Sequence, residues 1–249
     1  SREALNEWVF RQVTDVSTLR IKIFADGANL SDIRNLSKNP LIKGFTTNPT
    51  LMRRAGVENY VTFARQVLEI ITDRPVSFEV FADDPEAMKR QAREISSWGD
   101  NVNVKIPITN TRGESMAPIF KSLSNDGVKL NITAIMTLEQ IRATAGSLNT
   151  DVPSIVSVFA GRIADTGRDP VPMMREAVDI LSTTPRAELL WASPREVMNV
   201  FHADHCGAHI ITLTHDLIAK IAVLGKSLDQ FSLETVQMFH RDADAAGYS

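Results

Sequence analysis

Eight short apolar segments recur along the chain at a nearly regular interval. Their first residues lie 23, 32, 26, 26, 26, 34 and 21 residues apart. Each interval has room for one helix and two short loops, and alternating strands and helices favour parallel strands joined by right-handed crossovers. The segments are Ile21–Ala25, Gly44–Thr46, Val76–Val80, Val102–Ile106, Val128–Thr133, Ser154–Phe159, Glu188–Trp191 and His209–Leu213. This repetition predicts an α/β protein with a closed (β/α)8 barrel.

A doubly wound open sheet is the alternative to the barrel. Such a sheet usually has fewer strands and often carries a glycine-rich nucleotide fingerprint, which is not found in this sequence. Gly225-Lys226-Ser227 resembles the end of a phosphate loop, but Lys220 stands where that motif requires glycine. The sequence therefore favours the barrel.

Several intervals between the apolar segments carry helix-start signals. Asp84-Pro85, Asp169-Pro170 and Ser193-Pro194 each combine a capping residue with a proline suited to the first turn. Thr137 and Gln140 have the spacing of a capping box. We predict a helix at each of these positions.

We predict one barrel domain over residues 1–249, because no stretch has the composition of a linker. Residues 1–20 and 232–249 lie outside the eight repeats and are predicted to be a helical extension and a terminal helix. The second of these is expected to cover the barrel or contact a neighbouring subunit.

Composition narrows the function classes. Hydrophobic residues make up 43% and charged residues 23%, as in ordinary soluble globular proteins. The net charge of −3 argues against a nucleic-acid partner. Cys206 is the only cysteine, which excludes a disulfide framework and fits a reducing compartment. No apolar stretch approaches membrane length and residues 1–7 show no signal-peptide core, so we expect a cytoplasmic protein without a membrane partner.

Polar side chains occupy one face of several predicted strands. In Val102–Ile106, the side chains of Asn103 and Lys105 point away from the face shared by the valines and isoleucine. The same alternation places further side chains on the inner face: Ser77, Glu79, Asn131, Thr133, Ser157 and Phe159. Asp26 directly follows the first strand. Since active sites of this fold lie at the carboxyl ends of the strands, we expect these groups to converge there.

Lys105 is the most informative of these residues. A buried ammonium needs an ion partner, or its pKa falls. One interpretation is a structural salt bridge to Glu79 or Asp26, and the other is an amine nucleophile that forms a Schiff base with a ketone. Asp26 and Glu79 would then supply the acid–base groups, and Thr133 could support a water molecule.

Two arginines follow late strands. Arg162 follows the sixth strand, and Arg195 is expected in the first turn of a helix after the seventh. Two guanidinium groups beside a helix N-terminus indicate a phosphate site, although either arginine alone is equally compatible with a solvated surface role. Arg168 is a weaker candidate. His202–Cys206 could suggest a metal site, but it follows a helix, so a helix terminus is the preferred interpretation and no metal is expected.

Five segments resemble the transaldolase family in order and at fitting spacing: Gly44–Thr50, Val102–Thr109, Asn131–Thr133, Ser157–Ile163 and Ala192–Arg195. The resemblance covers about Ile21 to Leu224. It implies a class I aldolase-type barrel with no metal or organic cofactor.

The resemblance also implies roles for individual residues. Lys105 resembles the Schiff-base lysine, Asp26 the acid–base group, and Glu79 with Thr133 the pair that holds the catalytic water. The positions that resemble sugar-binding and phosphate-binding residues are Thr46, Asn48, Asn131, Ser157, Phe159, Arg162, Ser193 and Arg195.

Two positions separate the subfamilies. Glu79 and Phe159 are similar to those of transaldolases, whereas fructose 6-phosphate aldolases have glutamine and tyrosine there. Pro194 departs from the family, which often has an aromatic residue before the arginine. The resemblance implies transfer of a dihydroxyacetone unit from a ketose phosphate, of the sedoheptulose 7-phosphate or fructose 6-phosphate type, to an aldose phosphate in the pentose phosphate pathway.

Three alternatives remain open. They are an aldolase that releases free dihydroxyacetone, a related enzyme acting on another sugar, and a non-catalytic sugar-phosphate binder. Short members of the family form rings of five or ten subunits through the last helix, so we expect a homo-oligomer with residues 232–249 at the interface.

Overall fold

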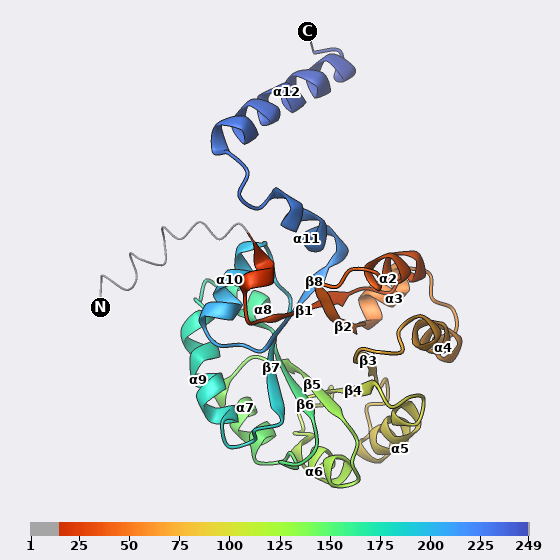
Figure 1. The fold of residues 1–249 in the computed structure, drawn as a ribbon. Helices are drawn as coiled ribbons and strands as arrows, with labels where there is room; N and C mark the ends of the chain where they lie inside the picture. The colour runs from red at the N-terminus through yellow and green to blue at the C-terminus, as the bar shows by residue number, and fades with distance from the viewer. Residues whose placement is uncertain (1–14, 249) are drawn as a thin grey trace. The chain divides into compact units, whose positions relative to one another are not determined.

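The computed structural model describes residues 15–248 and contains a closed barrel of eight parallel strands in the order β1 to β8. Figure 1 shows helices α4 to α7 and α9 outside the ring of strands. The strands are β1 (Lys22–Asp26), β2 (Ile42–Thr46), β3 (Val76–Glu79), β4 (Val102–Pro107), β5 (Leu130–Ile135), β6 (Ser154–Val158), β7 (Ala187–Trp191) and β8 (Ile210–Thr214). The predicted (β/α)8 barrel is confirmed, and the open sheet is excluded because β8 pairs with β1.

Helices fill the connections between strands and follow the last strand. They are α2 (Leu30–Leu36), α3 (Pro49–Arg54), α4 (Tyr60–Ile70), α5 (Pro85–Ser96), α6 (Ala117–Asn125), α7 (Leu138–Ala145), α8 (Ala160–Asp165), α9 (Val171–Leu181), α10 (Met198–His205), α11 (His215–Lys220) and α12 (Leu228–Ala246). The 3-10 turns are η1 (Val16–Thr18) and η2 (Ile221–Val223). Two connections, after β2 and after β6, contain an additional short helix close to the strand end, and these two helices, α3 and α8, flank the site described below.

The amino-terminal part of the barrel interior is packed with apolar side chains. Phe24, Ile155, Leu190 and Ile210 form a buried cluster across four strands. Gly44 is required beside this cluster, because a Cβ atom there would lie 2.5 Å from Cζ of Phe24. The interior is therefore closed at this level, as is usual for such barrels.

The structure tests the predicted helix starts. Asp84 caps α5 by accepting a hydrogen bond from the backbone N–H of Ala87, and Thr137 with Gln140 forms the expected capping box of α7. At Asp169-Pro170 the helix begins one residue later than a first-turn proline would require, because Pro170 takes the N-cap position of α9.

The predicted helix start at Ser193-Pro194 is wrong. Helix α10 begins at Met198, so Arg195 lies in the preceding loop. Ser193 has a φ of 56°, in the left-handed region, which is incompatible with the extended N-cap conformation that the prediction assumed.

The chain divides into two compact units. Among the described residues, the barrel comprises residues 20–218, and the second unit comprises residues 15–19 with 219–248. The predicted helical extension over residues 1–20 falls largely on residues 1–14, outside the described residues; residues 16–18 form the turn η1. At the other end, α12 begins before residue 232 and stops at Ala246. No helix within residues 15–248 is both long and apolar enough to cross a membrane. The single-domain organisation stays a prediction.

Candidate active site

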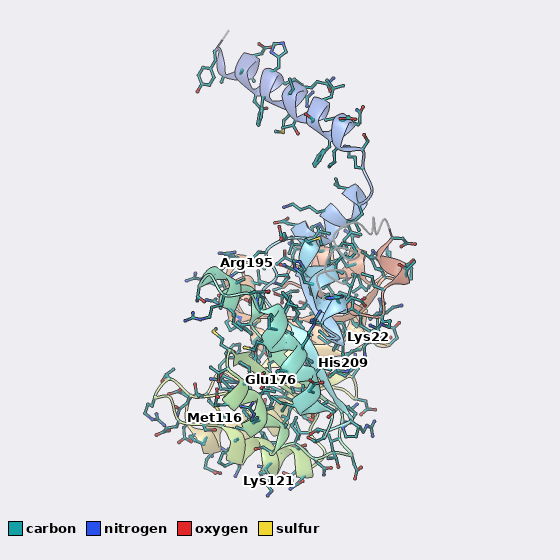
Figure 2. All side chains as sticks on the ribbon, turned by 90° about the vertical axis from the view of Figure 1, so that its left-hand side faces the viewer. Lys22, Met116, Lys121, Glu176, Arg195 and His209 are labelled. Atoms are coloured by element: carbon teal, nitrogen blue, oxygen red, sulfur yellow. The ribbon has the colours of Figure 1, made fainter. Side chains whose placement is uncertain are left out.

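A cavity of about 600 Å³ lies at the carboxyl ends of the strands. It is lined by all the residues to which the family resemblance assigns a catalytic or substrate-binding role: Asp26, Thr46, Asn48, Glu79, Lys105, Asn131, Thr133, Ser157, Phe159, Arg162, Ser193 and Arg195. Figure 2 shows Arg195 well separated from Lys22, the first residue of β1, and from His209, which directly precedes β8. The structure thus brings these twelve side chains together at the end of the barrel where this fold binds substrates. Ser77 and Asn103, which were expected there as well, do not line this cavity, and Asn103 lines a separate one beside Phe24.

Strand register explains why these side chains meet. Glu79 of β3 is paired with Lys105 of β4, and Lys105 is paired in turn with Asn131 of β5. On the two preceding strands, Asp26 of β1 is paired with Thr46 of β2, and β2 pairs with β3. Paired residues of neighbouring parallel strands point to the same face, so the interior receives these polar groups side by side.

Lys105 is buried, with 9% of its surface exposed, and it lies between two acceptors. Its Nζ donates to Oε1 of Glu79 at 2.9 Å and to the backbone carbonyl of Thr47 at 2.5 Å. The other carboxylate oxygen of Glu79 accepts a hydrogen bond from Oγ1 of Thr47 at 2.9 Å. The salt bridge considered in the sequence analysis is therefore present, and it holds the amine in place at the cavity.

Asp26 lies at the end of β1 and is held by two neighbours. Oγ1 of Thr46 donates to its Oδ1 at 3.0 Å, and Nδ2 of Asn48 donates to its Oδ2 at 3.2 Å. Burial raises the pKa of Asp26 above its ordinary value of 3.8, and the positive charge of Lys105 opposes part of this increase. A carboxyl group with a raised pKa is better matched to proton exchange near neutral pH.

Asn48 has two functions in the structure. Its Oδ1 caps α3 by accepting from the backbone N–H of Leu51 at 2.9 Å, while its Nδ2 reaches Asp26. Pro49 in the first turn of α3 favours a helix start at this point. The local sequence therefore fixes the amide beside the carboxyl group.

A second hydrogen-bonded chain crosses β3, β5 and β6. Ser157 donates to Asn131 at 2.6 Å, and Asn131 donates to Ser77 at 3.0 Å. Thr133 follows Asn131 on the same strand, and its buried Oγ1 has no hydrogen-bond partner within the described part of the chain. A buried hydroxyl without a partner in a polar cavity is suited to hold a bound water or a substrate hydroxyl.

The arginine side of the cavity is more exposed. Arg162, near the start of α8, is solvent-exposed, whereas Arg195 pairs with Asp165. Nε of Arg195 donates to Oδ1 of Asp165 at 3.0 Å, and Nη2 donates to Oδ2. Arg168 is not among the cavity-lining residues; its guanidinium donates to Oγ1 of Thr166.

The first turn of α8 is in close contact with the segment that follows β7. The N–H of Gly161 donates to the carbonyl of Ala192 at 3.3 Å. A Cβ atom at Gly161 would lie 1.5 Å from the carbonyl oxygen of Ser193, so only glycine allows this approach. The contact places α8, which carries Arg162, against the loop that carries Arg195.

Sequence reasoning missed several residues of the site. Thr47 contacts both Lys105 and Glu79, Thr212 shares a 2.5 Å hydrogen bond with Thr46, and Arg54 also lines the cavity. Thr47 stands next to Thr46 in a segment already noted, but strand alternation assigns the two neighbours to opposite faces. Both can face the site because β2 ends at Thr46 and the alternation stops there.

No group of three or more histidine, cysteine, aspartate or glutamate side chains within residues 15–248 could hold a metal ion. His202 and His205 lie in α10, and Cys206 follows that helix as its C-cap. The helix-terminus interpretation of this segment agrees with the structure.

The barrel and its polar cavity define a (β/α)8-barrel protein with an enzyme-like site at the carboxyl ends of its strands. The family profile described as Transaldolase/Fructose-6-phosphate aldolase matches residues 23–249. A probable transaldolase of Dehalococcoides mccartyi is 33% identical over 81% of this chain and 90% of its own length, and one of Methanococcus maripaludis is 35% identical over 81% and 89%. The chain belongs to the transaldolase/fructose-6-phosphate aldolase family and is an aldolase- or transaldolase-type enzyme.

Two solved structures share the barrel architecture at low sequence identity. A putative phosphonomutase from Burkholderia cenocepacia has a TM-score of 0.56 and 12% identity, covering 89% of this chain and 94% of its own. KGPDC from Streptococcus mutans has a TM-score of 0.51 and 9% identity, covering 80% and 89%. At this identity they show the shared fold alone.

Proposed function

We propose that this enzyme transfers a dihydroxyacetone unit from a phosphorylated ketose to an aldose phosphate through a Schiff base on Lys105. The observation that carries the proposal is the burial of the Lys105 amine at the cavity between Glu79 and the carbonyl of Thr47. Fructose 6-phosphate and sedoheptulose 7-phosphate are the donor types that we expect. Because the amine is held at a defined point, a bound ketone can be aligned for attack.

The first step joins the enzyme to the donor. After the Lys105 ammonium passes a proton to Glu79, its hydrogen-bond partner, the amine attacks C2 of the ketose and forms a carbinolamine. The carbinolamine hydroxyl takes up a proton and leaves as water, which gives an iminium ion. Proton transfers are needed at the carbinolamine oxygen. Glu79 and Thr133 are proposed to hold the water involved, which the unpaired Oγ1 of Thr133 within the described residues supports.

The second step breaks and remakes a carbon–carbon bond. Asp26 accepts the proton of the C4 hydroxyl, the C3–C4 bond breaks, and its electron pair moves into the iminium to form an enamine. The aldehyde product leaves with its phosphate. The enamine then attacks an acceptor aldehyde, Asp26 returns the proton, and hydrolysis of the new iminium frees Lys105. The raised pKa of Asp26 supports this role in both directions.

The remaining cavity residues are proposed to hold the sugar. Asn48, Asn131 and Thr46 would bind hydroxyl groups, with Ser157 and Phe159 beside them. Arg162, Ser193 and Arg195 would bind the phosphate, because guanidinium groups offer several donors in a geometry that matches phosphate oxygens.

Two residues favour transfer over release of free dihydroxyacetone. Glu79 and Phe159 both line the cavity. Phenylalanine has no hydroxyl group to protonate the enamine. The enamine would therefore persist until an acceptor aldehyde binds.

We also propose a homo-oligomer in which α12 forms part of the interface. Several large apolar side chains of this helix are exposed, including Phe231, Val236 and Phe239. Exposed apolar surface of this extent favours contact with another protein surface. The pentameric or decameric ring, the cytoplasmic location and the pentose phosphate pathway remain parts of this proposal.

Borohydride reduction in the presence of fructose 6-phosphate tests the proposal. It should add the mass of a reduced adduct to Lys105, and Lys105→Met should abolish both the adduct and the transfer activity. Activity that proceeds without an acceptor aldehyde would indicate the aldolase instead. A folded wild-type protein that forms no adduct with any ketose phosphate would contradict the covalent mechanism.

A further inference from the structure

Asp165 is the one carboxylate that contacts an arginine of the cavity within residues 15–248, and no proposed catalytic role uses it. It ends α8, three residues after Arg162, and residues at this spacing share one side of a helix. Its two oxygens accept from Nε and Nη2 of Arg195 in a side-on, two-point arrangement. Asp165 itself is not among the cavity-lining residues, so it holds Arg195 from outside the cavity.

The three charged groups form one cluster. Hydrogen bonds from Arg195 lower the pKa of Asp165, and the positive charges of Arg195 and Arg162 lower it further. The same pair raises the pKa of Arg195. Arg162 therefore lies close enough to act on Asp165 electrostatically, and the cluster carries two positive charges and one negative charge.

Asp165 uses only some of the N–H donors of Arg195, and the others can bind a ligand. A guanidinium group has five N–H donors, and Asp165 occupies one on Nε and one on Nη2 of Arg195. Both donors of Nη1 and the second donor of Nη2 are left. The backbone of Arg195 is also held in place, because its N–H donates to Oδ1 of Asn199 at 2.7 Å.

We propose that Asp165 is a counter-ion that weakens phosphate binding at Arg195, so that a phosphorylated aldehyde can leave before the next one binds. The inference rests on the proposed function, in which two phosphorylated aldehydes use the same end of the cavity in every turnover. A phosphate dianion that reaches Arg195 meets a carboxylate behind the same guanidinium, and the like charges repel each other. Without Asp165, both arginines would face the ligand with their full charge.

Two other roles for Asp165 predict different results. If the carboxylate only orients Arg195, its removal should weaken phosphate binding. If the pair is an ordinary surface salt bridge, its removal should leave phosphate binding unchanged, since about half of each side chain is exposed. The direction of the change in affinity therefore distinguishes the three roles.

The test measures binding of inorganic phosphate to the full chain by calorimetry. Asp165→Asn keeps an oxygen acceptor for Arg195 but removes the charge, and it should bind phosphate about two- to fivefold more tightly than wild type. Asp165→Glu restores the carboxylate and should return the affinity toward that of wild type. Unchanged or weaker binding in Asp165→Asn would overturn the proposal.

A matched control comes from a different part of the barrel. Glu176 of α9 pairs with Nη2 of Arg142 at 2.7 Å and is similarly exposed. Figure 2 shows Glu176 well separated from Arg195. Glu176→Gln removes a comparable surface pair and should leave phosphate affinity unchanged. A gain equal to that of Asp165→Asn would show a general effect of net charge and would overturn the proposal.

A second measurement separates this inference from the proposed function. Borohydride trapping with unphosphorylated dihydroxyacetone should label Lys105 equally in wild type and Asp165→Asn. If Lys105 of the wild type is not labelled, the Schiff-base function is contradicted. If labelling is normal but Asp165→Asn binds phosphate as wild type does, only the counter-ion role is overturned. If wild type binds no phosphate, the proposed phosphate site and the counter-ion role both fail.

Discussion

The two sides of the cavity are built in different ways. On the side of β3 and β4, Lys105 and Glu79 are buried, and Thr47 contacts both of them within 2.9 Å. On the side of β6 and β7, Arg162 is exposed and Arg195 has about half of its side chain in solvent. Groups proposed to react are held by several contacts in a low-dielectric interior, whereas groups proposed to recognise the substrate are open to solvent and can exchange ligands with water.

This difference follows from the energetics of charges. A buried ion pair is costly unless every hydrogen-bonding site is satisfied, which explains the dense contacts around Lys105. An exposed pair contributes little to stability, so Arg195 can share its donors at low cost. Substitutions on the buried side should therefore change the reaction, and those on the exposed side should change substrate affinity.

Asp26→Asn should have the largest effect, on the buried side. Loss of the acid–base group should lower kcat by about 10²–10⁴-fold. Burial raises the pKa of Asp26, so the folded state binds more protons than the unfolded state, and its contribution to stability falls as pH rises above 3.8. The asparagine variant should thus unfold at a higher temperature than wild type at pH 7, with the gain shrinking as pH falls toward 3.8. Steady-state kinetics and thermal unfolding at several pH values check both effects.

Unchanged kcat in Asp26→Asn would remove Asp26 from the proposed reaction. A variant that is less stable than wild type at pH 7 would show that the hydrogen bonds from Thr46 and Asn48 outweigh the cost of burying the charge.

Arg162→Gln should have the next largest effect, on the exposed side. Loss of the charged donor should lower kcat/KM for phosphorylated donors by about 10- to 100-fold, mostly through KM, because hydrogen bonds to charged groups are stronger than neutral ones. Labelling of Lys105 by unphosphorylated dihydroxyacetone should be retained. The wild-type KM for phosphorylated donors should also rise with salt, since exposed charges are screened.

Arg142→Gln is the matched control for this experiment, because Arg142 is a similarly exposed arginine of α7. It should leave both kinetic constants unchanged. If Arg162→Gln lowers kcat equally for phosphorylated and unphosphorylated donors, the arginine side of the cavity also contributes to the reaction, and the proposed division between the two sides is wrong.

Thr47→Val should give the smallest effect and sharpen the comparison. Valine has nearly the same shape but cannot donate to Glu79 or to the carbonyl of Ser77, so activity should fall by about two- to tenfold and stability by about 1–3 kcal/mol. Thr47→Ser keeps the hydroxyl and should retain most of the activity. Activity assays with chemical unfolding check this pair. If Thr47→Ser loses as much activity and stability as Thr47→Val, the methyl packing contributes as much as the hydrogen bond, and the hydroxyl has no special role.

Local sequence was sufficient for much of the fold and part of the site. All eight strands lie at or within two residues of the predicted segments, because parallel strands buried on both faces must be short and apolar. The alternation in Val102–Ile106 identified Lys105 as an inward residue, since a strand gives its side chains only two directions. The capping box of Thr137 and Gln140 was likewise predicted from residues close together in the sequence.

Local sequence patterns did not predict the conformation of the loops. Ser193-Pro194 has the residues of a helix start, yet the carbonyl of Ser193 packs against Gly161, and α10 begins only at Met198. That contact joins two connections distant in sequence. No local preference encodes it.

The order of apolar and polar residues by itself determined two things. The repeat of short apolar segments determined the barrel and placed Asp26 at a strand end. The two-residue period of a strand determined the inward direction of Lys105 and Glu79. Only the tertiary structure decided that Thr47 contacts both members of the buried pair and that Asp165 pairs with Arg195. Such contacts arise where separate strands and loops meet, and their energies depend on distances that are set by the packing of the whole barrel.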